Sequence, residues 1–356
     1  MTYRPRLSEE EYNLIKEYRG IQNAAENSGL NVKDLKHGWL KTDKASLFFK
    51  NPSYTEPDTE DLTEIDFESI VKKYCKPLKL NPVFKDSDFL FDRTVYTDTH
   101  VGMNVNPNGY SLYDGKWDEE EIINTCDQII EHTLRYQKSD VLVLDDLGDF
   151  ADGWDGKTVR REHDLPQNMD NQKVFDVGLH FKTRLTDGLF KHYKNIIVNN
   201  ICNSNHSSAF DYVINQAFKN IANLKYSNVE VNNCRKFISH YEVKDHYFII
   251  THGKDDKNLK FGFKPILDKK QENKIDNYLK QNYIFDPAKP VEFSKGDSHQ
   301  YIFDNATSDT FSYYNYPALS PSSDWVKTNF QKGKRGFVNF NYRIKGEKSI
   351  NEKIIY

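Results

Sequence analysis

Short apolar runs that alternate with longer amphipathic segments are the feature that most constrains the fold of this chain. Five runs have the composition of buried strands: residues 89–97, 140–144, 194–199, 247–251 and 291–293. Four longer segments between them have the apolar spacing and length of helices: residues 119–136, 172–192, 208–224 and 269–282. Strands that alternate with helices predict a layered α/β domain. Beyond residue 300, patches rich in Tyr, Phe and Asn predict strands of a second sheet.

Polar clusters follow most of these apolar runs. There are five: Asp98-Thr99-His100, Gly148-Asp149-Phe150-Ala151-Asp152, Asn205-His206, Thr251-His252-Gly253 and Gly296-Asp297-Ser298-His299. Aspartate, asparagine and histidine are ligands for hard-to-borderline divalent metals. One such cluster alone is typical of a solvated loop or of a structural histidine. Five in order, at the ends of strands that meet at one edge of a sheet, predict a two-metal hydrolytic site.

The order of these motifs resembles the calcineurin-like metallophosphoesterase superfamily. The resemblance covers residues 90–300, and the segments 154–171 and 317–337 resemble phage-encoded members. It implies a two-sheet α/β/β/α sandwich of the metallophosphoesterase type. It also implies two divalent metal ions, for which we expect Mn²⁺, with Mg²⁺, Fe or Zn²⁺ as the alternatives.

The resemblance assigns roles to individual residues. Seven are the implied metal ligands: Asp98, His100, Asp149, Asn205, His252, Asp297 and His299. Asp149 would bridge the two metals. His206 would be the general acid or would stabilise the phosphate.

Three departures from the family pattern bear on these roles. Asp297 stands where a histidine is usual, and a carboxylate there favours Mn²⁺ or Mg²⁺ over Zn²⁺. Ser207 replaces the acid that usually follows the Asn-His pair, which removes an expected orienting partner of His206. The bridging residue is Asp149 or, in a shifted register, Asp146. We favour Asp149 because only that register keeps a glycine before the aspartate.

The predicted function is hydrolysis of phosphodiester bonds by a metal-dependent phosphoesterase, and we favour a nuclease that acts on DNA. A cyclic-nucleotide phosphodiesterase or a phosphomonoesterase is the alternative, as is a non-catalytic nucleic-acid or partner-binding protein that retains the fold. Arg160 and Arg161 lie in a basic stretch and are predicted to grip a phosphate, unless that stretch is a solvated loop. Trp325 is predicted to stack a base or, alternatively, to fill the core.

Composition defines the remaining regions of this 356-residue chain. Residues 1–49 predict a small helical region, with a helix–turn–helix as the alternative to a packed helical hairpin, and the proline-containing, acidic residues 50–85 predict a linker or arm. The metallophosphoesterase domain then covers residues 86–356.

No apolar run is long enough for a membrane span, and the four cysteines form no CxxC pair. We therefore expect a cytoplasmic protein, in the host cytoplasm if it is phage-encoded. The net charge of −4 neither indicates nor excludes a nucleic-acid substrate, because bound metals can supply positive charge.

Overall fold

The structure is a computed structural model, and its described part is not continuous. It comprises residues 88–106, 115–159, 163–253, 264–284, 286–323, 335–343 and 347–355, together with residues 13, 73, 326 and 333. The predicted N-terminal helices and the predicted linker lie outside the described residues, apart from two isolated positions. Arg160, Arg161 and Trp325 also lie outside them, so their substrate contacts stay predictions. None of the described helices has the length and apolar character that a membrane span requires.

A six-stranded mixed sheet forms the first of two central layers, in the order β11-β10-β1-β2-β3-β4. Its strands are β1 (Phe89–Tyr96), β2 (Val141–Asp146), β3 (Asn195–Ile201), β4 (Val229–Cys234), β10 (Arg335–Arg343) and β11 (Lys348–Ile355). Strands β1 to β4 run parallel, whereas β10 pairs antiparallel with β1 and with β11. The carboxyl ends of β1, β2 and β3 therefore meet at one edge of this sheet.

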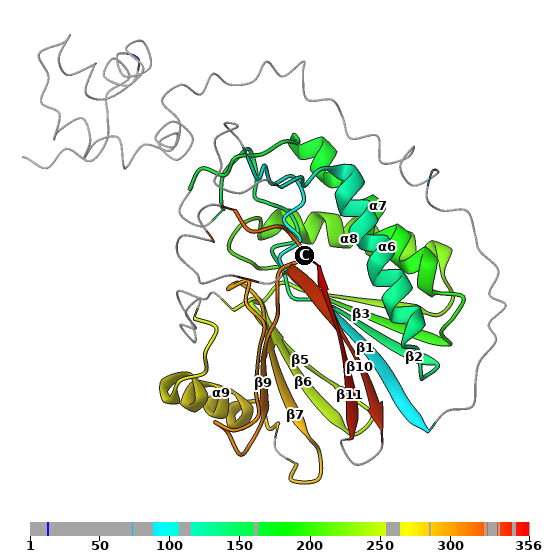
Figure 1. Ribbon diagram of the computed structural model, residues 1–356, viewed down its shortest axis with the longest axis vertical. Coiled ribbons are helices and arrows are strands. Elements are labelled where there is room, and N and C mark those ends of the chain that lie inside the picture. Colours follow the sequence, from blue (N-terminus) through cyan, green and yellow to red (C-terminus); the bar gives the residue numbers. More distant parts are fainter. Residues whose placement is uncertain are drawn as a thin grey trace, which may run out of the picture. The chain divides into compact units, whose positions relative to one another are not determined.

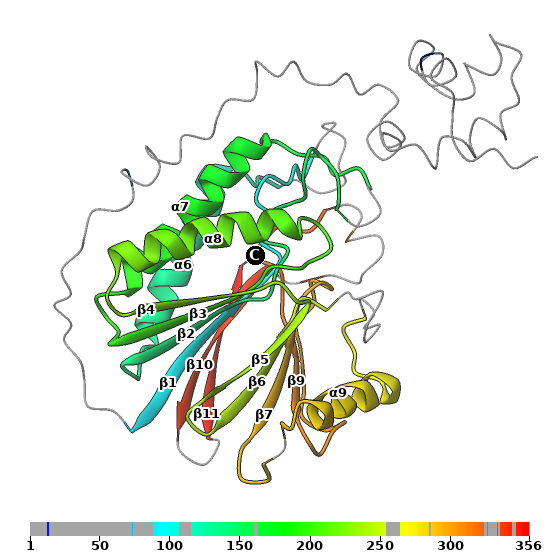
Figure 2. The same ribbon diagram turned by 180° about the vertical axis from the view of Figure 1, so that it is seen from behind.

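A five-stranded sheet forms the second layer, in the order β5-β6-β7-β9-β8. Its strands are β5 (Ile238–Val243), β6 (His246–Thr251), β7 (Val291–Lys295), β8 (Ile302–Asp304) and β9 (Ser312–Asn315). Strands β6, β7 and β9 run parallel. The two sheets lie face to face, and their helices lie on the outer faces (Figures 1 and 2). This arrangement confirms the predicted α/β/β/α sandwich.

Helices α6 (Glu119–Arg135), α7 (Asn171–Leu189) and α8 (Ala209–Lys225) cover the first sheet, and α9 (Lys269–Gln281) covers the second (Figure 1). Aspartate side chains cap three of these helices. Asp118 accepts a hydrogen bond from the Glu121 amide, Asp170 caps α7 in the same way, and Asp268 forms a capping box with Gln271. These caps set the starts of the helices within a few residues of the positions predicted from the sequence.

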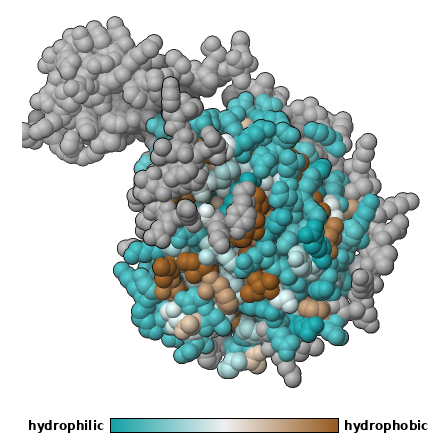
Figure 3. Space-filling view, viewed as in Figure 1, coloured by the Kyte–Doolittle hydropathy of each residue, from teal (hydrophilic) through white to brown (hydrophobic). Residues whose placement is uncertain are grey.

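Three apolar clusters correspond to the three interfaces between the layers. The middle cluster joins β1, β6 and β10 through Phe91, Phe248 and Phe340. A larger cluster lies under α6, α7 and α8, and a smaller one lies under α9. Within β6, Phe248 belongs to the middle cluster and Ile249 to the α9 cluster, as expected of a strand buried on both faces. In Figure 3 the coloured residues of the visible face are mostly hydrophilic.

The prediction of a second sheet beyond residue 300 is correct only in part. Strands β8 and β9 do belong to the second sheet, but β10 and β11 extend the first sheet next to β1. An alternating pattern indicates which side chains are buried, but it does not identify the partner strand. Strands β4 and β5 were not predicted. In β4 only Val231 is fully buried, so its sequence lacks a strong apolar pattern.

Candidate metal centre

All five polar clusters lie at one edge of the sandwich. Asp98 and His100 follow β1, Asp149 follows β2, and Asn205 follows β3. From the second sheet, His252 follows β6, and Asp297 and His299 follow β7. Backbone hydrogen bonds hold the first two loops together: the Asp98 amide donates to the Gly148 carbonyl at 3.0 Å, and the His100 amide donates to the Asp149 carbonyl at 3.0 Å. The sandwich therefore brings together side chains from both sheets.

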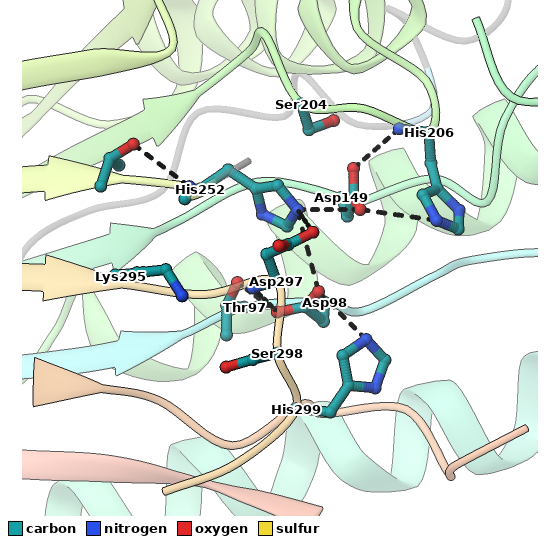
Figure 4. A network of polar contacts seen from close by, with 12 residues as sticks. Thr97, Asp98, Asp149, Ser204, His206, His252, Lys295, Asp297, Ser298 and His299 are labelled. Atoms are coloured by element: carbon teal, nitrogen blue, oxygen red, sulfur yellow. Dashed lines mark hydrogen bonds and ion pairs between the residues drawn. The ribbon is translucent and has the colours of Figure 1, made fainter. Parts of the chain in front are cut away.

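The first group of facing side chains consists of Asp98, His100 and His299. Nε2 of His299 lies 3.3 Å from Oδ1 of Asp98, and Nε2 of His100 lies 3.7 Å from the same oxygen. All three residues are buried, and they can each offer one ligand atom to a common centre. Figure 4 shows His299 and Asp98 pointing toward each other.

A second group shares Asp98 with the first and adds Asp149 and His252. Nε2 of His252 lies 2.9 Å from Oδ2 of Asp149 and 4.0 Å from Oδ1 of Asp98. Asp149 also belongs to a third group, with His100 and His206. The groups thus overlap through aspartate side chains, which is the arrangement that two neighbouring cations require.

Asp297 points into this cluster. Its Oδ1 lies 3.6 Å from Nε2 of His252, and its amide donates to Oδ2 of Asp98 at 3.1 Å (Figure 4). Its Oδ2 is buried and has no hydrogen-bond partner among the described residues. The aspartate that replaces the usual histidine is therefore placed where it can offer an oxygen to a cation.

Unsatisfied buried atoms test whether these residues fit a metal. Within the described part of the chain, Oδ1 of Asp98, Oδ1 of Asn205, Oδ2 of Asp297 and Nδ1 of His299 are buried without a hydrogen bond. An unpaired buried polar atom costs about 1–3 kcal/mol, so folded proteins rarely contain several of them in one place. Divalent cations would satisfy the oxygens among them, which are of the kind that hard metals prefer. The residues therefore fit a metal centre.

Opposite charges shape the protonation of the cluster. Burial alone would raise the pKa of Asp98, but His299 and His252 outweigh it and hold that pKa well below its usual range. Burial alone would lower the pKa of His100, but the Asp152 and Asp98 carboxylates raise it to about 10. Asp149 and Asp98 likewise raise the pKa of His252 well above its ordinary value, against the effect of burial. The ionised carboxylates thus attract positive charge into the centre.

Asp152 belongs to the second polar cluster, but the sequence analysis assigned it no role. Its Oδ1 lies 2.9 Å from Nδ1 of His100 and 3.0 Å from Nδ1 of His206. Burial would raise the pKa of Asp152, but its bonds to the two histidines lower it, so the carboxylate is ionised and can only accept. Each histidine therefore donates from Nδ1. Asp152, 54 residues away in sequence, thus orients His206 although the acid that usually follows the Asn-His pair is replaced by Ser207.

The alternative bridging residue, Asp146, lies outside the cluster. Its Oδ2 accepts a hydrogen bond from Nζ of Lys182 at 2.6 Å, and its Oδ1 accepts one from the Gly148 amide at 3.0 Å. Both of its oxygens thus have partners within the domain. Asp149, by contrast, faces His252 and His206, and its Oδ1 accepts from the His206 amide at 3.0 Å (Figure 4).

Two further buried residues support the loops of the centre. Oδ1 of Asp211 accepts from the Ala151 amide and Oδ2 accepts from the Ser204 hydroxyl, both at 2.9 Å. Nζ of Lys295 donates to the Lys264 carbonyl at 3.0 Å and to Oδ1 of Asn315 at 3.1 Å. Burial lowers the pKa of Lys295 to about 8, although Asp297 and Asp98 oppose the shift. Neither residue was predicted: Asp211 lies within α8, and Lys295, although it directly precedes the Gly296 cluster, is the last residue of β7.

Comparisons with known proteins give a distant likeness of fold. No protein-family model and no curated protein sequence matches the chain. Among solved structures, it is similar to Vps29 from Entamoeba histolytica (9% identity, 74% of this chain and 99% of that chain, TM-score 0.31). It is also similar to a predicted phosphoesterase from Streptococcus pneumoniae (13% identity, 74% of this chain and 97% of that chain, TM-score 0.28). A third similar structure is a 5′-nucleotidase from Candida albicans (11% identity, 78% of this chain and 52% of that chain, TM-score 0.33). Likeness at this level says nothing about activity, which must be argued from the geometry of the centre.

Proposed function

We propose that this chain is a binuclear metal-dependent phosphoesterase that hydrolyses phosphodiester bonds. The observation that supports this proposal most strongly is the set of overlapping Asp/His groups at the edge of the sandwich, with unsatisfied ligand atoms among them. A purely structural cluster would be expected to satisfy its own polar atoms. A cluster that leaves them free is suited to bind cations, and the shared aspartates suit it to bind two.

In this proposal Asp98, His100 and His299 hold the first cation, and Asn205, His252 and Asp297 hold the second, with Asp149 between them. Divalent cations, when bound, supply Lewis acidity at the phosphoryl oxygens and lower the pKa of a water molecule. Four of the seven ligands offer oxygen atoms, which favours Mn²⁺ or Mg²⁺ over Zn²⁺. The chain itself contributes the fixed positions of these ligands, because most of them are buried on short loops between rigid elements.

His206 is the proposed general acid. Asp152 accepts from its Nδ1 at 3.0 Å, which fixes the orientation of the ring. Its Nε2 lies 3.8 Å from Oδ2 of Asp149, at the side of the proposed bridge. Unlike the ligands, the His206 side chain is 22% exposed, so that it can reach a substrate. From this position Nε2 can donate a proton to the departing oxygen of an ester.

Hydrolysis of bis-p-nitrophenyl phosphate in the presence of Mn²⁺ tests the proposal. We expect the wild-type protein to release p-nitrophenol, Asp149→Asn to abolish the activity, and His206→Ala to lower kcat by about 10²–10⁴-fold. Asp127→Asn is the matched control, because Asp127 pairs with Arg184 on the exposed surface of the helices. A wild-type protein that is inactive with Mn²⁺, Mg²⁺, Fe²⁺ and Zn²⁺, or an Asp149→Asn variant with full activity, would contradict the proposal.

For the substrate we favour a nucleic acid, and DNA in particular, on the predicted basic stretch and the predicted N-terminal helical region. Rates on single-stranded DNA, duplex DNA, cyclic nucleotides and phosphomonoesters decide between this and the alternative substrates. A nuclease cleaves the first two fastest. Binding of DNA without cleavage would instead favour the non-catalytic alternative.

A further inference from the structure

Trp154 presents a large aromatic surface on the loop that follows the Gly148–Asp152 cluster. It is 47% exposed, although most large apolar side chains of the described domain are buried. Its ring stands nearly perpendicular to the ring of Phe210, with centroids 4.8 Å apart. Phe210 lies in the first turn of α8, and its amide donates to the Ser207 carbonyl, directly after the Asn205-His206 cluster. The indole of Trp154 thus packs against Phe210 with one part of its surface and exposes the rest to solvent.

The loop that holds Trp154 is tightly bonded. The amides of Trp154 and Lys157 each donate to the carbonyl of the other residue, at 2.9 and 3.0 Å. Gly153 has a φ of +98°, and a Cβ atom there would lie 2.3 Å from the Lys157 carbonyl oxygen, so only glycine fits this turn. The Gly156 amide donates to the Gln167 side chain at 3.0 Å. An exposed tryptophan on such a loop is held in place before any ligand arrives, which reduces the entropic cost of binding.

Two contacts connect this loop to the proposed general acid. Asp152, which accepts from His206, precedes Trp154 by two residues, so their Cα atoms are at most about 7 Å apart. On the far side of the turn, the Val159 amide donates to the His206 carbonyl at 2.7 Å. Trp154 therefore lies on a loop whose two ends both contact His206, through Asp152 and Val159.

We propose that Trp154 binds the nucleobase of the substrate by stacking, and that the substrates are accordingly nucleotide esters. This inference rests on the proposed phosphoesterase function and narrows its substrate class. Every base offers a π face, so a single aromatic platform selects for nucleotides without selecting among sequences. A preformed indole on the loop that also carries Asp152 would help to orient the substrate relative to His206.

Cleavage of a dinucleoside monophosphate, compared with an analogue in which one nucleoside is an abasic tetrahydrofuran, tests this inference. We expect Trp154→Ala to raise KM for the dinucleotide about tenfold more than for the abasic analogue. Trp154→Tyr, which keeps an aromatic face, should restore most of the difference. Tyr283→Ala removes an aromatic side chain that is 91% exposed at the end of α9, and should change neither value. Equal losses on both compounds in Trp154→Ala would overturn the inference.

A binding measurement separates this inference from the proposed function. Calorimetry with thymidine monophosphate and with deoxyribose 5-phosphate, on Mn²⁺-loaded protein, requires no turnover. We expect the wild-type protein to bind the nucleotide about tenfold more tightly than the sugar phosphate, and Trp154→Ala to lose that preference. If the wild-type protein cleaves neither the dinucleoside monophosphate nor its abasic analogue but keeps this preference, the proposed function fails and the stacking site stands. If the wild-type protein shows no preference, the stacking site fails.

Discussion

Several residues of the candidate metal centre have a backbone conformation that residues other than glycine rarely adopt. Asp98, His100, Asp149, Asp297 and His299 have φ values of 52°, 46°, 47°, 72° and 54°. The left-handed region costs about 1–2 kcal/mol for most L-residues and somewhat less for Asp and Asn. Such strain tends to accumulate where function requires a particular side-chain direction. Here all five residues lie within four positions of the end of a strand, where their side chains meet at one edge of the sandwich.

Removal of Asp152 should weaken the centre through the two histidines that it orients. In Asp152→Ala the Nδ1 atoms of His100 and His206 lose their common acceptor, and partners of this kind are typically worth about 10–100-fold in metal affinity or activity. We expect a loss of that size in kcat on bis-p-nitrophenyl phosphate, together with weaker Mn²⁺ binding by calorimetry. Asp152→Asn keeps one oxygen acceptor, so its kcat and Mn²⁺ affinity should lie between those of the wild-type protein and those of Asp152→Ala. Unchanged kcat and Mn²⁺ affinity in Asp152→Ala would show that the two hydrogen bonds have no functional role.

Asp211 should act as a positioning residue, because it joins the loop of Asp149 to the loop of Asn205 and His206. Asp211→Ala leaves the Ala151 amide and the Ser204 hydroxyl without their acceptor, at a cost of about 1–3 kcal/mol in the free energy of unfolding. Asp211→Asn retains an oxygen for the amide, so we expect it to recover most of the stability and most of the Mn²⁺ affinity. Urea unfolding with and without Mn²⁺ measures both quantities. If Asp211→Ala lost stability but kept its Mn²⁺ affinity, Asp211 would contribute to folding and not to positioning of the metal ligands.

At the scale of elements, the sequence predicted most of the helices and central strands, because their apolar periodicity reflects burial directly. It did not predict β4 or the pairing of β10 with β1, which depend on contacts between distant segments. The same distinction holds at the metal centre. The motifs located the ligand candidates, since each follows its own strand. Asp152 lies within one of these motifs and Lys295 adjoins another, but their supporting roles, like that of Asp211, depend on contacts with distant segments.

A buried carboxylate at the opposite end of the sheet connects three elements. Oδ2 of Asp92, in β1, accepts from the amides of Lys138 and Ser139, and its Oδ1 accepts from Asn341 of β10 at 2.7 Å. Burial raises the pKa of Asp92 to about 6, although these hydrogen bonds oppose the shift. The folded protein thus holds this proton more tightly than the unfolded chain, whose aspartates have pKa values of about 3.9.

Stability should therefore decrease as the pH rises through the interval between these two pKa values. Relative to Asp92→Asn, we expect the free energy of unfolding of the wild-type protein to fall by about 2 kcal/mol between pH 4 and pH 7. Urea titrations of both proteins at each pH measure the difference between their free energies of unfolding. A chelator in the buffer prevents metal binding from contributing to this difference. A difference between the two proteins that stays constant over this interval would show that Asp92 titrates at its ordinary value.

At the scale of the whole molecule, the candidate metal centre lies where the edges of two sheets meet. Asp98, Asp149 and Asn205 come from the first sheet, whereas His252 and Asp297 come from the second. Cations held between them would tie the two layers of the sandwich together. Because a ligand that binds only the folded state stabilises it, metal binding and closure of the sandwich are expected to be coupled.

Anomalous diffraction from crystals grown with Mn²⁺ tests the central claim most directly. The account predicts two manganese peaks per chain, both in contact with Asp149, one also bound by His299 and the other by Asn205, His252 and Asp297. An Asp149→Asn crystal, prepared identically, should lose at least one of the two. A single peak away from Asp149, or a wild-type crystal with no manganese at this edge of the sandwich, would contradict the account.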